Sequence, residues 1–426
     1  MKKLFKTILL AFVLLPAVML LAACSSSDPS TPQKPTTINS NMITLEYNEV
    51  VYDGFAKEPA VTLTVNGYTV DSKYYSCEYT NNIDAGLASV SVTITKNNSY
   101  ATGTATKSFN IKRQSVEVNT LETLNNAIKN TANSNTMLVL SGDITSTIAS
   151  NGYIQPVLIC PENKHLDLVL DLNGYSIFTE VWIVKEYYHN NGIIGKTGTF
   201  VTTENSAKVL ITNSKNTGIV GINNQEYVGV DHAFIFKLTD NFQVTLAKLT
   251  TYGFDSGFYS NGNYSGNSTI NASNCTFNGL GDENVGTYLA SNNKYNFTNC
   301  TFNGLSAYYA KSGTHKLYNC KFNALKETYV NPTEFNGNGY YPNGSAICVD
   351  SSQGYTTILL IDIYGATFTR VCNNAYDIDE FSTHIAGGSV TPYAEVKIHK
   401  NNSYSSNGTK QVKINTENNA VSQTNN

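Results

Sequence analysis

The chain has 426 residues and a formal net charge of −4, and charged residues make up only 14% of it. Arginine occurs at two positions, Arg113 and Arg370. Because proteins that bind nucleic acid depend on clusters of lysine and arginine, this composition argues against a nucleic-acid partner. The sequence has no Cys-x-x-Cys pair, which argues against a structural zinc site.

Residues 1–23 are predicted to be a secretion signal that is not part of the fold. A basic start is followed by an apolar run from Thr7 to Leu21. The sequence Leu21-Ala22-Ala23-Cys24 then resembles the signal of bacterial lipoproteins, which implies cleavage before Cys24 and a lipid on its thiol. The lipid would make the membrane a partner of the protein and hold it in the cell envelope. The alternative is an ordinary secretory signal or a membrane-spanning helix.

Two segments are expected to lie outside any folded domain. Residues 24–40 are rich in Ser, Thr and Pro, and this composition predicts a flexible tether that holds the protein off the membrane, with the folded part exposed at the surface. The Asn-rich tail, residues 415–426, is predicted to be disordered.

Residues 41–114 are predicted to form a small β-sandwich. Short runs of alternating apolar residues, such as Val90, Val92 and Ile94, are separated by Gly, Asn and Asp turns. The order of its phrases, beginning with Tyr52-Asp53-Gly54, resembles the YDG-type immunoglobulin-like repeats of bacterial surface proteins. The resemblance implies an immunoglobulin-like module that acts as a spacer or a binding unit.

Residues 115–414 contain a phrase that occurs three times, at strides of 25 and then 20 residues. It is Asn-Cys-Thr-Phe-Asn-Gly at 274–279 and at 299–304, and Asn-Cys-Lys-Phe-Asn-Ala at 319–324. Strides of this length are too short for a βαβ unit, which needs about 30 residues. They suit one coil of a parallel β-helix, made of three short strands and three turns.

The repeated phrase also predicts how each coil is built. Its first position is Asn, or Gly at Gly365 in the related phrase 363–368, and both residues tolerate a left-handed backbone, so we expect a sharp turn there. A weaker copy at 211–213 puts Asn213 at that position. The Cys and the Phe alternate with Thr or Lys and are therefore expected to face inward. Coils in register would stack Phe277 on Phe302.

A capping helix is predicted at the start of this domain, over residues 120–130. Leu121, Leu124, Ala127 and Ile128 would share one face of it. Strands are expected at residues 137–140, 157–159 and 166–172. The helix, the phrase at 172–177 and the Asn-Cys-x-Phe repeat together resemble the pectate-lyase-like right-handed parallel β-helix superfamily over residues 116–410. This implies an all-β fold but no particular activity, because the superfamily contains lyases, hydrolases, adhesins and inert scaffolds.

The cysteines of the repeated phrase, Cys275, Cys300 and Cys320, are expected to stack inward. Buried free cysteine behaves as a small hydrophobic residue, which favours free thiols. A disulfide between neighbours in the stack is the alternative, because neighbouring coils bring their Cα atoms within bridging range.

The strongest acidic cluster is Asp377-Ile378-Asp379-Glu380, with Arg370 seven residues earlier and with Asp350 and Asp362 in preceding coils. In β-helix lyases such carboxylates bind Ca²⁺ beside a basic side chain, so calcium is the one cofactor that this cluster would suit. The alternative is a solvated turn with a surface ion pair. The motifs of β-helix polygalacturonases are absent, and the six histidines are scattered. No catalytic or metal-binding residue is therefore assigned.

Tyrosine pairs next to turns favour binding over catalysis. In an extended pair one ring faces inward and one outward, so outward rings aligned along the coils would form a ladder for stacking sugar rings. We assign glycan contact to Tyr308, Tyr309, Tyr340 and Tyr341. The insertions at 185–203 and 327–345 are expected on the binding face. The alternative is that tyrosine simply suits a pleated surface.

The sequence thus predicts a surface lipoprotein of the cell envelope with one immunoglobulin-like domain and a parallel β-helix. We expect a non-catalytic, adhesin-like protein that contacts a polysaccharide or host glycan. A polysaccharide lyase or glycoside hydrolase on the same scaffold is the alternative, and a purely structural envelope component is a third reading.

Overall fold

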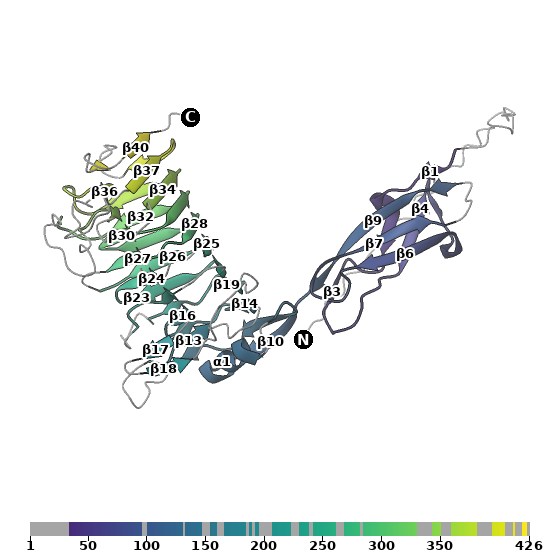
Figure 1. Ribbon diagram of the computed structural model, residues 1–426, viewed down its shortest axis with the longest axis horizontal. Helices are drawn as coiled ribbons and strands as arrows, with labels where there is room; N and C mark the ends of the chain where they lie inside the picture. The colour runs from purple at the N-terminus through teal and green to yellow at the C-terminus, as the bar shows by residue number, and fades with distance from the viewer. Residues whose placement is uncertain are drawn as a thin grey trace, which may run out of the picture. The chain divides into compact units, whose positions relative to one another are not determined.

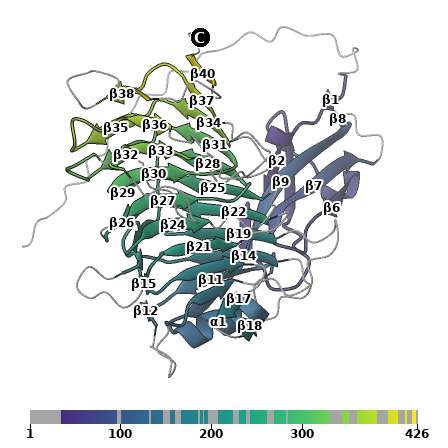
Figure 2. The same cartoon turned by 60° about the vertical axis from the view of Figure 1, so that its left-hand side comes forward.

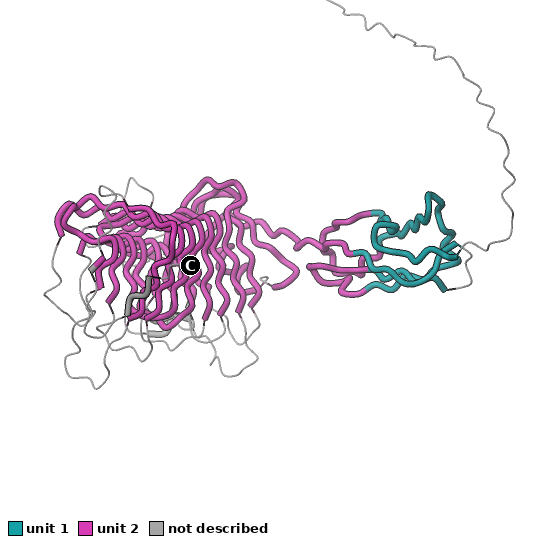
Figure 3. The backbone as a smooth tube through the Cα atoms, turned by 90° about the horizontal axis from the view of Figure 1, so that it is seen from above, with its two compact units in different colours: residues 1–46, 59–79, 90–107 teal, residues 47–58, 80–89, 108–426 magenta. Residues whose placement is uncertain are grey.

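The computed structural model describes residues 34–95, 100–130, 133–146, 154–159, 166–184, 187–189, 192–195, 207–222, 230–237, 242–260, 268–281, 284–329, 343–350, 359–380, 394–404, 412–413 and 420–423. The backbone divides into two compact units, one of residues 1–46, 59–79 and 90–107 and one of residues 47–58, 80–89 and 108–426 (Figure 3). Cys24, Tyr340 and Tyr341 lie outside the described residues.

The N-terminal strands form small sheets (Figure 1). Two strands pair in parallel, three pair antiparallel, and four form a sheet in the order β3-β9-β7-β6. The strands are β1 (Thr36–Thr37), β2 (Ile43–Leu45), β3 (Glu49–Val51), β4 (Val61–Val65), β5 (Tyr68–Thr69), β6 (Tyr75–Thr80), β7 (Gly86–Ile94), β8 (Ala101–Thr102) and β9 (Thr104–Lys112). Because β1 pairs with β8, the prediction that the tether extends to residue 40 is wrong at its C-terminal end.

The rest of the chain is a parallel β-helix made of three stacked sheets (Figure 2). The first sheet contains β10 (Gln114–Val118), β11 (Thr136–Leu140), β14 (Leu166–Asp171), β19 (Ala207–Thr212), β22 (Phe242–Ala247), β25 (Thr269–Ser273), β28 (Lys294–Thr298), β31 (Thr314–Tyr318), β34 (Leu359–Tyr364), β37 (Ala394–Ile398) and β40 (Ala420–Gln423). The second contains β12 (Ile144–Thr145), β15 (Ile177–Phe178), β20 (Val220–Gly221), β23 (Thr250–Gly253), β26 (Thr276–Gly279), β29 (Thr301–Gly304), β32 (Lys321–Ala324), β35 (Thr367–Arg370) and β38 (Ser403–Tyr404).

The third sheet contains β13 (Val157–Ile159), β16 (Val181–Val184), β21 (Phe234–Lys237), β24 (Ser256–Ser260), β27 (Val285–Leu289), β30 (Ser306–Ala310), β33 (Ile347–Val349), β36 (Ile378–Glu380) and β39 (Val412–Lys413). Among the described residues, nine successive coils therefore contribute one strand to each sheet, and β10 and β40 extend the first sheet at its two ends. The predicted fold class, an all-β chain with a small N-terminal β-domain followed by a parallel β-helix with a short capping helix, is confirmed, and the strands of the domain predicted as an immunoglobulin-like sandwich form small mixed sheets.

Neighbouring coils stack in the predicted register. In the second sheet Phe277 pairs with Phe302, Phe302 with Phe322, and Phe322 with Phe368. The rings of these consecutive pairs are stacked at centroid distances of 5.5, 5.2 and 5.5 Å. The Phe of every repeated phrase is fully buried, whereas Thr301 next to it is partly exposed, as the alternation requires.

The turn between the first and second sheets has a left-handed backbone. Asn274, Asn299 and Asn319 have φ values of 54°, 54° and 52°, and Gly365 has 61°. Lys248 occupies the same place in an earlier coil with a φ of 58°, although lysine rarely adopts this conformation. The prediction of such a turn at Asn213 is wrong. Its longer turn puts the left-handed residue at Asn216, while the Asn213 side chain accepts a hydrogen bond from the Gly174 backbone.

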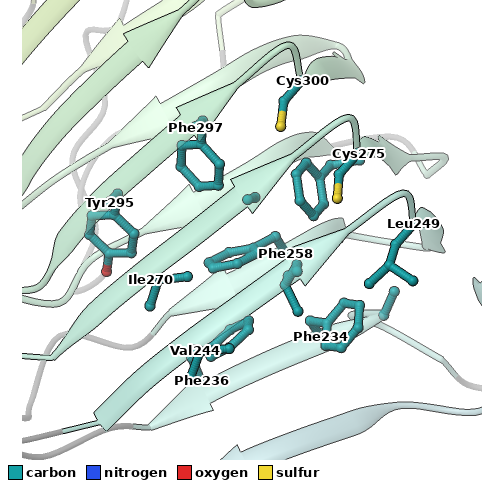
Figure 4. Packing of buried hydrophobic residues seen from close by; sticks show 14 of the residues in the cluster. Phe234, Phe236, Val244, Leu249, Phe258, Ile270, Cys275, Tyr295, Phe297 and Cys300 are labelled. Carbon is teal, nitrogen blue, oxygen red and sulfur yellow. The ribbon is translucent and has the colours of Figure 1, made fainter. Parts of the chain in front are cut away.

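A single apolar core fills the β-helix along its length. Figure 4 shows Phe258, Phe297 and neighbouring side chains pointing into it from adjacent coils. Cys275 and Cys300 lie in this core as free thiols, as does Cys320. The hydrogen bond with Cys300 and burial raise the pKa of the Cys275 thiol well above its ordinary value, so this thiol is unreactive.

The predicted capping helix is confirmed as α1 (Leu121–Asn130). Its predicted inner face, Leu121, Leu124, Ala127 and Ile128, is buried and belongs to the core of the β-helix. At its start, the Thr120 hydroxyl accepts a hydrogen bond from the Thr123 backbone at 3.1 Å. This contact satisfies one of the amide groups left unpaired in the first turn of a helix.

The C-terminal segment departs from its prediction. Residues 420–423, expected to be disordered, form β40 and pair in parallel with β37. The edge of a sheet offers unpaired backbone groups, and the last strand satisfies those of β37. The insertion at 185–203 contains an antiparallel hairpin of β17 (Tyr187–His189) and β18 (Gly192–Gly195). Within the described residues, no helix has the length and apolar character needed to span a membrane.

Candidate functional site

The tyrosine pair on β30 does not face solvent. Tyr308 and Tyr309 are 0% and 1% exposed. Tyr308 lies in the core with its hydroxyl 2.6 Å from Nδ1 of His315, and the Tyr309 hydroxyl donates to Asp350 at 2.7 Å. The expectation that one ring of this pair is available to a glycan is therefore wrong. The two other residues assigned to glycan contact lie outside the described part of the chain.

The acidic cluster on β36 is buried rather than solvated. Asp377 and Asp379 are 0% exposed. Nε of Arg370 lies 2.7 Å from Oδ1 of Asp377, and its Nη1 donates to the backbone carbonyls of Cys372 and Ala375. Arg370 thus fixes the conformation of the chain between β35 and β36 through these contacts. The alternative of a solvated turn with a surface ion pair is wrong.

Asp379 is held by neutral donors. Its Oδ2 accepts from the Tyr329 hydroxyl at 3.0 Å and from Nδ2 of Asn343 at 2.6 Å. Burial and the Asp379 charge raise the pKa of Tyr329 well above its ordinary value, so that its hydroxyl remains a donor. Asp362 lies apart from this cluster on β34 of the first sheet, 3.7 Å from Nε2 of His399.

Lys311 is enclosed by the outward side chains of neighbouring third-sheet coils. Its ammonium lies 3.7 Å from Oδ2 of Asp350 and 3.2 Å from the Tyr288 hydroxyl. It also lies 5.3 and 5.5 Å from the ring centroids of Tyr288 and Tyr309. Burial lowers the pKa of Lys311, against the opposing effect of Asp350. We call Tyr288, Tyr309, Lys311 and Asp350 the lysine cage.

No metal centre emerges from these groups. Among the described residues, no three His, Cys, Asp or Glu side chains come together in a way that could hold a metal ion. The calcium site suggested for Asp377 and Asp379 therefore has no support from the geometry, because Arg370 and Asn343 already occupy these carboxylates.

The outer face of the third sheet carries a partly exposed row of rings, which we call the aromatic stripe: Trp182, His232, Tyr259 and Tyr288. Trp182 pairs in register with Ile235, Ile235 with Tyr259, and Tyr259 with Tyr288. Trp182 lies on β16, Tyr259 on β24 and Tyr288 on β27, and these strands follow one another along the helix axis with β21 between β16 and β24 (Figure 1). His232 lies just before β21 and forms an isolated bridge with Ser256.

Rings in the aromatic stripe stack on each other. The Tyr259 ring lies 4.1 Å from that of His232, in the preceding coil, and 5.3 Å from that of Tyr288, in the next, at interplanar angles of 11° and 16°. Both faces of Tyr259 are thus covered, and only its rim is available to a ligand. The stripe offers hydrogen-bonding edges, not the stacking platform that the sequence suggested.

One carboxylate completes the stripe. Glu180 accepts a hydrogen bond from Nε1 of Trp182 at 2.6 Å through one oxygen and from the His232 backbone at 3.3 Å through the other. The His232 ring lies 3.0 Å, through Nδ1, from the Ser256 hydroxyl. Burial, only partly offset by these hydrogen bonds, raises the pKa of Glu180 to about 7. Its carboxyl group therefore changes charge near neutral pH.

A second row of stacked rings lies on the outer face of the first sheet. Tyr318 stacks on Tyr364 at 4.6 Å, and Tyr364 on His399 at 3.7 Å. These rings are also partly exposed. Beside this row, Lys316 and Lys397 flank Asp362 in register, so the row has both basic and acidic side chains next to it.

Sequence reasoning missed the aromatic stripe because its residues are neither paired nor evenly spaced. The available signal was that strands β24, β27 and β30 each carry a tyrosine, Tyr259, Tyr288 and Tyr309, at the position that register makes equivalent. Comparison with known proteins adds nothing to this assignment: no family model matches the chain, and neither a curated protein nor a solved structure is detectably similar to it.

Proposed function

We propose that this protein is a surface lipoprotein of the cell envelope that contacts glycans without cleaving them, through the aromatic stripe. The observation that carries the proposal is the register of Trp182, Tyr259 and Tyr288 on one sheet face. Neighbouring strands are about 4.8 Å apart, so Tyr259 and Tyr288 lie one strand spacing apart, and Trp182 lies two spacings before Tyr259. An extended polymer with a regular repeat can be contacted at several units by such a row.

The chemistry of the stripe suits sugar hydroxyls. A tyrosine hydroxyl both donates and accepts hydrogen bonds, and a carboxylate accepts them. Tyr259, Tyr288 and Glu180 supply these groups on one face, and Tyr259 is fixed in orientation by stacking on both sides. Side chains that are already ordered lose little entropy on binding, which favours affinity.

Burial of the ionisable groups favours a non-catalytic role. The side chains of Lys311, Asp350, Arg370 and Asp377 are all 0% exposed. A group that acts on a polymer must reach hydrogen-bonding distance of it. These four side chains instead form two ion pairs, and Lys311 and Asp350 also bond to the hydroxyls of Tyr288 and Tyr309.

Glycan binding by the full chain in mild detergent tests the proposal. We expect Tyr259→Phe with Tyr288→Phe to keep the stacked rings, remove two hydroxyls and weaken glycan binding about tenfold. The matched control is Tyr318→Phe with Tyr364→Phe, on the stacked row of the first sheet. Equal losses from the two pairs of variants, or no binding to any glycan, would rule the stripe out.

The lipoprotein assignment rests on the sequence of the first 24 residues. We propose that Cys24 carries the lipid, that residues 25–33 belong to the tether, and that the immunoglobulin-like sheets act as a spacer of the YDG type. Cys24→Ala should abolish incorporation of labelled palmitate and release the protein from the membrane fraction. Cys77→Ala, at an exposed cysteine, should change neither.

A lyase or hydrolase of the pectate-lyase-like superfamily is the second candidate. Its one supporting observation is the lowered pKa of Lys311, because such a lysine can act as a base, and it would require Lys311 to become accessible to the polymer. Incubation with polyuronides and neutral polysaccharides, with detection of unsaturated products and new reducing ends, decides between the two. Turnover that disappears in Lys311→Met would replace the binding proposal.

A further inference from the structure

Glu180 lacks a positively charged neighbour among the residues that the structure describes. Its contacts there are the indole of Trp182 and the backbone of His232, both neutral donors. The charge of Asp231, another carboxylate, acts on it and opposes its ionisation. A largely buried carboxylate with no counter-charge is costly, and a cationic group from outside would remove that cost.

Further acidic groups lie at the same end of the aromatic stripe. Asp231 and Asp255 are exposed, and the Asp255 backbone donates to the Asp231 carbonyl at 2.8 Å, which keeps the two residues adjacent. Ser256, which follows Asp255, contacts the His232 ring of the stripe. Negative charge gathered at one end of the aromatic stripe attracts cations and repels anions.

The lysine cage at the other end shows what this sheet face accommodates. There a primary ammonium lies over the rings of Tyr288 and Tyr309 and within 3.7 Å of the Asp350 carboxylate. Aromatic rings and a carboxylate together form a favourable setting for an ammonium group. Glu180 and Trp182, four coils before Lys311, bring a carboxylate and an aromatic ring together again.

We infer that the aromatic stripe binds a glycan carrying protonated amino groups, with the Glu180 carboxylate pairing with an amine of the ligand. The inference rests on the proposed function and assigns its ligand class. It excludes polyuronides, whose carboxylates would meet Glu180, Asp231 and Asp255. Tyr259 and Tyr288 contact the sugar hydroxyls of the same chain, which favours a glycan over a basic peptide.

The test compares three oligosaccharides of equal length on the full chain: glucosamine oligomers, their fully N-acetylated forms and oligogalacturonates. We expect the free-amine form to bind about tenfold or more tightly than the acetylated form, because a charge-assisted contact is lost on acetylation. Glu180→Gln should remove this preference. Glu395→Gln, at the Lys397 ion pair of the first sheet, is the matched control and should keep it.

The outcomes separate the two proposals. Equal binding of the amine and acetylated forms, or tighter binding of oligogalacturonate, overturns the inference and leaves glycan contact standing. Equally tight binding of oligolysine, or binding that requires Ca²⁺, overturns it as well. Absence of binding to all three oligosaccharides and to neutral glycans overturns the proposed function itself. Thermal unfolding of Glu180→Gln, expected at an unchanged or higher temperature, shows that a lost preference does not reflect unfolding.

Discussion

The β-helix contains two columns of stacked rings that differ in their exposure to solvent. The inner column, Phe277, Phe302, Phe322 and Phe368, lies in the core with all four rings fully buried. The outer column is the aromatic stripe, whose rings are only partly buried. Neighbouring rings lie 5.2 to 5.5 Å apart in the inner column and 4.1 to 5.3 Å apart in the outer one.

The stacking of Phe277 on Phe302 and of Tyr259 on Tyr288 follows from parallel pairing in register, so ring spacing alone does not distinguish the two columns. The two columns differ in how far their rings are exposed to solvent. Each inner ring removes apolar surface from water, whereas the outer rings keep polar rims at the surface. A solenoid can therefore stack rings into a core column on one sheet and into a partly exposed row on another.

The largest expected effect is on the inner column. Phe302→Ala removes a ring that contacts Phe277, Phe322 and Tyr308, and we expect a loss of about 3–5 kcal/mol of unfolding free energy, from lost burial and the cavity left behind. Thr301→Ala, at the neighbouring outward position, should change it by less than about 1 kcal/mol. Urea unfolding followed by circular dichroism measures both, and similar losses would contradict the assignment of faces.

A second effect is the dependence of the core on pH. Burial lowers the pKa of His315 from 6.5 to about 4, against the opposing effect of its hydrogen bond to the Ser312 carbonyl. The unfolded chain therefore binds a proton more readily than the folded one below pH 6.5. The contribution of His315 to the free energy of unfolding is intact above pH 6.5. As the pH falls toward 4, this free energy decreases by roughly 3 kcal/mol in all.

The variant His315→Gln isolates this contribution. It keeps a polar side chain beside Tyr308 and does not titrate. We expect its unfolding free energy to start lower near neutral pH and to decline less steeply toward pH 4 than that of the unmodified chain. Parallel declines would show that His315 is not the titrating group.

Local sequence predicted the inner column but not the state of the outer tyrosines. Alternation and a recurring Asn turn fix which side of a strand Phe277 faces, and both are visible in six residues. Whether an outward ring is exposed depends on other coils. Tyr309 is covered because Asp350, one coil later, bonds its hydroxyl and Lys311 lies over its ring. Such contacts cannot be derived from alternation within one strand.

The turns show the same limit of prediction from local sequence. Asn274 and Asn299 were predictable because asparagine tolerates a left-handed backbone. Lys248 was not, since register with the neighbouring coils imposes a conformation that its own side chain disfavours. β40 was missed because its composition suggests disorder, whereas pairing with the exposed edge of β37 supplies the missing stabilisation.

A smaller effect follows from that imposed turn. Lys248→Asn should raise the unfolding free energy by about 1 kcal/mol, because a φ of 58° costs asparagine less than lysine. Lys248 is exposed, so no buried contact is lost. Lys248→Ala keeps the backbone cost and should give no gain, which makes it the control. A gain from alanine equal to that from asparagine would point to the lysine charge and not to the turn.

The smallest effect concerns the outer column itself. Tyr259→Ala and Tyr288→Ala, made singly and together, form a double-mutant cycle for the ring pair at 5.3 Å. We expect a coupling of about 0.5–1 kcal/mol, the usual value for a cross-strand aromatic pair, and single losses well below that of Phe302→Ala. A coupling of this size means that the stripe orients its own rims for a ligand at little cost to the fold. Losses as large as those in the inner column would instead make the stripe part of the core, and the binding proposal would lose its basis.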